Sequence, residues 1–220
     1  PVLGETVQLA GSVARDAAGA ISANSLAITS GPLSATGAAR IAGDTLDASV
    51  KGTLGDVAPL AAGASGAIGF SATAKGALTA PDLDLTVSSD KLLVAERAIE
   101  NLVLNATAKA DLDNPSANVR LTGTVGGEAL DGKAVLETAD GNRAVRDLTL
   151  SLGANRIAGA LSLDPAFVPE GTIDLTLPDI GPLAALALET VEGSLDGRIV
   201  FERGSGEPRI AIDATSKSIV

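Results

Sequence analysis

Hydrophobic and polar residues alternate over most of the chain, which is the pattern of strands that bury one face. The clearest runs place Leu, Ile or Val at nearly every second position, with polar groups between them: residues 82–88, 119–125, 147–152, 173–177 and 209–213. Dipeptides that favour tight turns separate such runs: Gly126-Gly127, Asp131-Gly132, Asp140-Gly141 and Asn114-Pro115. We therefore predict an all-β chain in which turns join successive strands.

Helical signals are confined to two short segments. Residues 182–190 begin with Pro and continue with Ala and Leu, which favours a helix with Pro near its first position. Residues 59–62 form a shorter version that Gly63 ends. We expect one or two very short helices, acting as a cap or crossover over the sheet. The segment 182–190 could alternatively be an amphipathic partner helix.

These two helical segments belong to an internal repeat. Residues 56–62 (Asp-Val-Ala-Pro-Leu-Ala-Ala) are similar to residues 179–185 (Asp-Ile-Gly-Pro-Leu-Ala-Ala), and Arg-Ile-Ala-Gly occurs at both 40–43 and 156–159. Ordered landmarks with variable spacers predict an elongated repeat architecture, stabilised between neighbours. We expect one continuous unit over 1–220, with repeat units of approximately 40–155 and 156–220.

Composition excludes several functional classes. The chain contains no Cys, His, Met, Trp or Tyr, and Phe occurs three times among 220 residues. Without Cys or His there is no thiol nucleophile, no Ser-His-Asp triad and no zinc site of the usual kind. The formal net charge of −11 and an aromatic share of 1% disfavour binding to nucleic acid. We predict that the protein is not an enzyme, with no catalytic residue, cofactor or metal.

Three partial motifs are best explained by structure. Residues 127–134 are one residue short of a phosphate-binding loop, since Ala134 replaces its hydroxyl residue, and two hairpin turns explain the glycines. Residues 88–91 contain Ser-x-x-Lys at a polar strand end instead of a helix start. Residues 111–114 begin like a calcium loop but lack its later ligands, which favours a turn.

The aliphatic face of the strands needs a cover, because few helices are available. It must either close against itself or hold an apolar ligand. Sugars would require aromatic stacking and nucleotides basic or glycine-rich clamps, whereas an acyl chain needs only a dry aliphatic lining. The candidate lining residues are Leu83, Leu85, Val87, Leu121, Leu148, Leu150, Leu152, Ile173, Leu175, Leu177, Ile210 and Ile212. The alternating carboxylates, such as Asp82, Asp84, Asp174 and Asp213, are expected on the solvated opposite face.

The order of these landmarks resembles the AsmA-like/TamB family, the translocation and assembly module of Gram-negative bacteria. The resemblance rests on residues 76–85 (Gly-Ala-Leu-Thr-Ala-Pro-Asp-Leu-Asp-Leu) and on 175–183 leading into 193–197, and it spans roughly 40–220. It implies an elongated sheet folded lengthwise into a trough, a β-taco with an apolar concave interior. It also implies a periplasmic segment of an inner-membrane-anchored protein, with the outer-membrane barrel TamA as partner through another segment.

The resemblance and the aliphatic face together favour one function. We expect non-enzymatic, bridge-like transport of phospholipid across the periplasm through a hydrophobic groove, together with support of outer-membrane protein assembly. The alternative is a structural or adhesive β-stalk with a closed, dry core. A polysaccharide-acting β-solenoid enzyme is disfavoured by the missing aromatic subsites.

The ends of the chain and its longest uncharged run bear on its setting. The first residue is not Met, and we interpret the chain as a piece of a longer protein. Residues 17–39 are uncharged but rich in Ala, Gly, Ser and Thr, with a Pro among them. A membrane span needs about 20 strongly apolar residues, so this run is not expected to cross a membrane. Membrane contact is expected only through regions outside the segment.

Overall fold

The computed structural model describes residues 6–94, 97–186, 191–203 and 209–219. Strands make up 74% of the structure, so the all-β prediction is confirmed. The strands are β1 (Gln8–Arg15), β2 (Ile21–Ser30), β3 (Leu33–Ala42), β4 (Thr45–Leu54), β5 (Ala64–Gly66), β6 (Ile68–Ala77), β7 (Asp82–Val94), β8 (Arg97–Lys109), β9 (Ser116–Val125), β10 (Glu128–Ala139), β11 (Asn142–Leu152), β12 (Asn155–Leu163), β13 (Pro169–Leu177), β14 (Gly193–Glu202) and β15 (Arg209–Ile219).

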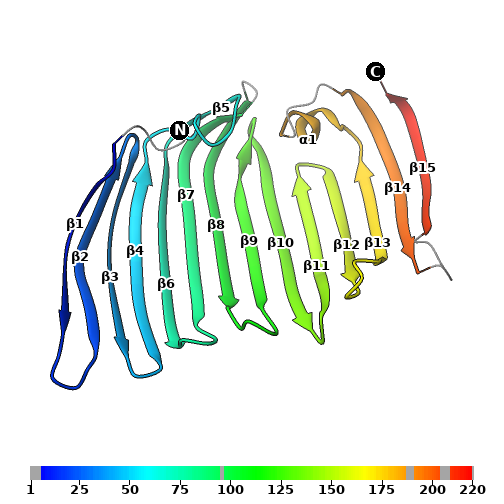
Figure 1. Cartoon of the computed structure of the whole chain (residues 1–220). Coiled ribbons are helices and arrows are strands. Elements are labelled where there is room, and N and C mark those ends of the chain that lie inside the picture. The colour runs from blue at the N-terminus through cyan, green and yellow to red at the C-terminus, as the bar shows by residue number, and fades with distance from the viewer. Residues whose placement is uncertain (1–5, 95–96, 187–190, 204–208, 220) are drawn as a thin grey trace.

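All described strands belong to one open antiparallel sheet of 15 strands. Each strand pairs with its neighbours along the chain, from β1 at one edge to β15 at the other (Figure 1). The short strand β5 is the exception, because it pairs with β7 beside β6. An open sheet that carries an apolar face is consistent with the expected β-taco.

The pairing register separates two faces of the sheet. Directly paired residues of antiparallel strands share a face, and we call the face that carries Leu83, Leu121 and Leu150 the apolar face. Leu85 pairs with Ala72 and Ala106, and Leu150 pairs with Gly132 and Ile157. The opposite, polar face carries pairs such as Asp82–Lys109 and Asp174–Arg198.

β-Bulges keep the apolar face continuous where two successive apolar residues of a strand are three positions apart instead of two. Register shifts occur next to Ser25, Asn101 and Asp147, whose φ angles are 52°, 50° and 49°. A left-handed residue in a bulge lets two strand residues oppose one and changes which face the next side chain takes. In β11, Val145 and Leu148 are three positions apart, yet their partners Leu161 and Gly159 lie on the same apolar face.

One rim of the sheet, formed by strand ends, has a packed core that we call the closed rim. The buried residues of this core are Leu54, Val57, Leu92, Ile99, Val125, Leu130 and Leu152. They come from strand ends β4 and β7–β11 and from the segment before β5. We call the opposite rim, where the hairpins β3–β4, β6–β7, β8–β9 and β10–β11 turn, the open rim (Figure 1).

Two similar caps lie at the closed rim. The segment 56–62 places Val57 in the core, and α1 (Gly181–Leu186) packs Leu183 against it. Both caps make the same hydrogen bonds: the Leu60 N–H donates to the Val57 carbonyl (2.8 Å), as the Leu183 N–H donates to that of Ile180 (3.0 Å). The two halves of this sequence repeat therefore share their geometry. The division into units 40–155 and 156–220 stays a prediction.

Asp56 and Asp179 hold these caps in equivalent positions. Asp56 Oδ1 accepts from the N–H groups of Ala58 and Gly66, both at 3.1 Å, and Asp179 Oδ1 accepts from Gly181 at 3.1 Å. We expect Asp56→Ala to lower the free energy of unfolding by about 1–2 kcal/mol and Asp179→Ala by about 1 kcal/mol, because acceptors of backbone N–H groups are lost. Urea denaturation measures both changes. Asp213→Ala, on the polar face of β15, is the control, and an equal loss there would contradict the assigned role.

Three local predictions need correction or restriction. Asp131-Gly132 is not a turn: both residues lie inside β10, and Gly132 is buried. A Cβ at Gly132 would lie 3.3 Å from Leu150 Cδ1 and 3.4 Å from Leu121 Cβ, so this glycine makes room for the two leucines. Residues 88–91 lie within β7 instead of at its end. The predicted helix 182–190 overlaps α1, and its last four residues lie outside the described residues.

Candidate functional site

All twelve residues proposed as a lining lie on the apolar face by register. Direct pairs connect them across the sheet: Val87 with Leu104 and Leu104 with Leu121 in one region, and Ile173 with Ile199 and Ile199 with Ile212 in another. The face therefore brings together side chains from β7, β9, β11, β13 and β15, which are up to 129 positions apart in the sequence. A role in holding lipid stays a prediction for each of them.

The twelve residues differ widely in exposure. Leu152 and Leu177, at the closed rim, are 1% and 7% exposed. Leu85 is 37% exposed, and Ile210 and Ile212 on the edge strand β15 are 60% and 68% exposed. The apolar face is thus closed at one rim and accessible elsewhere, because the two caps reach only part of it.

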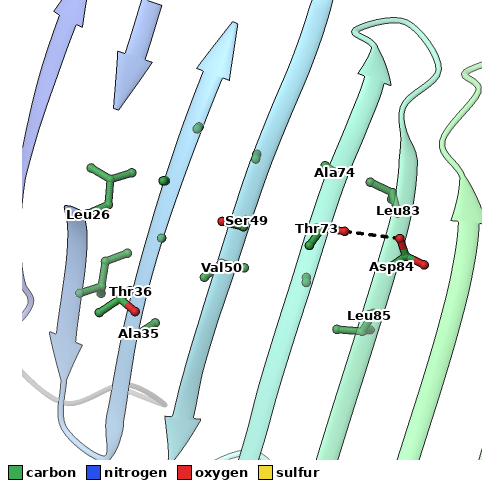
Figure 2. A pocket seen from close by; sticks show the side chains of 16 residues that line it. Leu26, Ala35, Thr36, Ser49, Val50, Thr73, Ala74, Leu83, Asp84 and Leu85 are labelled. Carbon is green, nitrogen blue, oxygen red and sulfur yellow. Dashed lines mark hydrogen bonds between the residues drawn. The ribbon is translucent and has the colours of Figure 1, made fainter. Parts of the chain in front are cut away.

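The accessible part contains a hollow of about 440 Å³ over β2, β3, β4, β6 and β7. Figure 2 shows Leu26, Ala35, Val50, Leu83 and Leu85 among its lining side chains. The hydrogen bond between the Thr73 hydroxyl and Asp84 (3.4 Å) joins β6 and β7 on the polar face behind it. This hollow suits hydrocarbon, because it exposes very little polar surface that could orient a sugar or a nucleotide.

Small residues create this hollow. The apolar face over β3, β4 and β6 carries mainly Ala and Gly, so the backbone lies at the floor of the hollow: Ala35, Gly37, Ala39, Ala48, Ala72 and Ala74. Gly52 is required by close packing, since a Cβ there would lie 2.7 Å from Phe70 Cζ and 2.8 Å from Ala35 Cβ. Over β11–β14 the same face carries Leu, Ile and Phe and is correspondingly fuller.

Charged residues on the apolar face occur only near the rims among the described strand residues. Arg15 in β1 and Arg143 in β11 lie at the open rim, whereas Arg97 and Glu128 begin strands at the closed rim. Between the rims, an uncharged stripe crosses the sheet from β1 to β15. A hydrocarbon chain lying along this stripe would meet no unpaired ion in a dry environment.

The polar face is held by exposed cross-strand ion pairs. Lys109 Nζ lies 3.1 Å from Asp82 Oδ1, and Arg198 Nε lies 2.6 Å from Asp174 Oδ1. The hydrogen bond and charge of Asp174 raise the pKa of the Arg198 guanidinium. Exposed pairs of this kind contribute little stability each, and they mark this face as the solvated one. A second hollow, of about 450 Å³, lies at Ser34, Lys51 and Thr86.

Two carboxylates with shifted pKa values stabilise turns at the open rim. Backbone N–H groups, foremost that of Ala20, and then the Arg40 side chain lower the pKa of Asp16. The N–H groups of Asn114 and Asp113 lower the pKa of Asp111. The calcium-like residues 111–114 are therefore a turn in which Asp111 binds the backbone. The described part of the chain has no group of three or more acidic side chains that could hold a metal ion.

Sequence reasoning missed two features of this face. The alanine-rich hollow lies partly in residues 17–39, for which the sequence pattern excludes a membrane span but predicts no part of a site. Its signal was Ala and Gly at every second position. Arg143 and Phe167, which contact each other at the open rim, were also not singled out. Their signal was a basic residue in the apolar phase of a strand.

Comparison with known families adds an independent observation. The family described as TamB, N-terminal domain, matches residues 2–176 of this chain. The chain belongs to the TamB family. Proteins of the TamB family form a non-enzymatic module of outer-membrane protein assembly and lipid transport, which spans the periplasm and works with a partner. No match was found among curated proteins or among solved structures. No helix in the described ranges is long and apolar enough to span a membrane.

Proposed function

We propose that this segment conducts phospholipid across the periplasm by holding acyl chains on its apolar face. The observation that carries the proposal is the uncharged stripe, which is continuous from β1 to β15 and accessible away from the closed rim. Exposed aliphatic surface of this extent is unusual for a soluble protein without a ligand. Membership of the TamB family supports the same proposed function.

Family membership supports the proposed setting. The segment lies in the periplasm as part of an inner-membrane-anchored protein, and another region contacts the outer-membrane barrel TamA. The apolar face then forms one stretch of a path for acyl chains between the two membranes. The phosphate and other polar headgroup atoms lie outside the uncharged stripe, since the stripe offers hydrocarbon only.

A structural or adhesive β-stalk is the second candidate. The packed core at the closed rim supports it, because seven side chains there are buried against one another. A stalk with a dry core would need the remaining apolar face to be covered as well. The 37–71% exposure of Leu9, Val13, Leu85 and Ile212 favours a conduit instead.

Photocrosslinking at adjacent positions tests the conduit. A benzophenone amino acid at Leu85, on the apolar face, is expected to crosslink to phospholipid in cells, because acyl chains pass within reach. The same group at Asp84 is the matched control, since it lies one residue away on the polar face. Mass spectrometry of the purified adducts identifies the lipid. Equal lipid yield at both positions, or none at Leu85, would contradict the proposal.

A further inference from the structure

Arg143 differs from most arginines of the chain in its position. It pairs with Leu163 and with Thr138 in the register of β11 and therefore lies on the apolar face, at the open rim. Beside it is a hollow of about 250 Å³ lined by Leu136, Val145, Leu161 and Leu163. A permanent positive charge thus stands at the border between a hydrocarbon surface and solvent.

Five other arginines are ion-paired with carboxylates. Arg40 pairs with Asp16, Arg120 with Asp131, Arg146 with Glu137, Arg198 with Asp174, and Arg203 with Asp164. Arg143 forms no ion pair with a carboxylate of the described residues. In a chain with a net charge of −11, leaving this guanidinium without a carboxylate keeps its charge available for an external anion.

Phe167 holds the Arg143 guanidinium in place. The Arg143 Cζ atom lies 4.6 Å from the centroid of the Phe167 ring, in a cation–π contact. A guanidinium over an aromatic ring keeps its in-plane N–H donors free for a planar or tetrahedral anion. Phe167 is 63% exposed, so the placement of its ring is not explained by burial in a core.

The loop that carries Phe167 is built to present the ring. Phe167 has a φ of 62°, which is uncommon for a large side chain and costs conformational energy. The Asp164 carboxylate compensates by accepting from the N–H groups of Ala166 (2.8 Å) and Val168 (3.0 Å), and the Asp164 carbonyl accepts from the Phe167 N–H (2.9 Å). The loop between β12 and β13 therefore fixes the ring beneath the Arg143 side chain of β11.

We propose that Arg143, supported by Phe167, binds the phosphate of a phospholipid whose acyl chain lies in the adjacent hollow. This proposal rests on the proposed lipid-conducting function and adds the place at which the headgroup meets solvent. The closed rim is filled by its core, so a headgroup has access to solvent at the open rim, where Arg143 lies. Phosphate is the favoured anion because a guanidinium can donate two parallel hydrogen bonds to its oxygens.

The test compares two lipids that differ only in the headgroup. The 220-residue chain is titrated with phosphatidylglycerol and with diacylglycerol, each carrying the same fluorescent acyl chain. We expect the parent to bind phosphatidylglycerol about tenfold more tightly than diacylglycerol. Arg143→Gln should remove this difference while leaving diacylglycerol affinity unchanged, and Arg143→Lys should restore part of it.

Arg146→Gln is the matched control, because Arg146 lies three residues away on the same strand and pairs with Glu137 at 2.9 Å. It should leave both affinities unchanged. An unchanged preference for phosphatidylglycerol in Arg143→Gln would overturn the phosphate site. If the melting temperature of that variant were also lower, the Arg143–Phe167 contact would be a structural clamp instead. The phosphate site would also be overturned if inorganic phosphate competed for it as effectively as phosphatidylglycerol does. If neither lipid binds the parent, the conducting function itself is wrong.

Discussion

Replacing Leu152 with alanine is expected to lower the free energy of unfolding by about 2–5 kcal/mol, the range for a large buried aliphatic side chain. Leu152 is 1% exposed and belongs to the closed-rim core with Leu130 and Val125. Its removal leaves a cavity that the paired strands cannot easily fill, because their hydrogen bonds fix the backbone. Chemical denaturation of the parent and the variant measures the loss.

Ile212→Ala provides the comparison for this prediction. Ile212 lies on the same face but is 68% exposed on the edge strand β15. Truncating it should change the free energy of unfolding by roughly 0.5 kcal/mol or less, since little apolar contact is lost. If the two variants lose equal stability, then the division of the apolar face into a packed rim and an accessible region is wrong.

Introducing a carboxylate into the accessible hollow is expected to abolish lipid binding while the sheet still folds. Val50 is 39% exposed and lines the hollow next to Ala35 and Ala72. In Val50→Asp the new charge can reach water in the empty protein, so the loss of stability should be small. Bound hydrocarbon would bury that charge without a partner, which is strongly unfavourable. Binding of a fluorescent phospholipid should fall at least about tenfold.

Ser49→Asp adds the same charge at the neighbouring position on the polar face. Ser49 pairs with Thr73, whereas Val50 pairs with Ala72. Lipid binding should be unchanged in this control. Positions such as Leu121 and Leu150 are less suitable for the test, because both pack against the closed-rim core and a charge there would also reduce stability. If Val50→Asp folds and binds lipid like the parent, the hollow has no role in binding.

The strands were predictable because their physical cause is local. Alternation in residues 82–88 and 173–177 requires one face of each segment to leave water, and β7 and β13 follow from it. The hairpin at Gly126-Gly127 was also predictable, since both residues have positive φ angles, 59° and 88°. At Asp131-Gly132 the same type of dipeptide gave a wrong prediction. The glycine there is required by the volume of the Leu121 and Leu150 side chains, which are distant in sequence.

The bulges and the position of Arg143 were not predicted from the sequence. The three-position spacing between Val145 and Leu148 includes Asp147, a residue type that tolerates the left-handed conformation. The sequence therefore carried a recognisable signal for this bulge. The Arg143–Phe167 contact had a weaker one. The two residues are brought together by the β11–β12 pairing and by the loop after β12, and neither local pattern specifies that distance.

The neighbour-to-neighbour order of the strands makes the span of the apolar face a simple multiple of the strand spacing. Adjacent strands are about 4.8 Å apart, so the 14 strands of the main path cover roughly 60 Å along the sheet. Inserting one hairpin would lengthen the face by about 10 Å and would disturb only the two strands that it separates. Such a sheet can be matched to the distance between two membranes by duplicating hairpins, without redesigning a shared core.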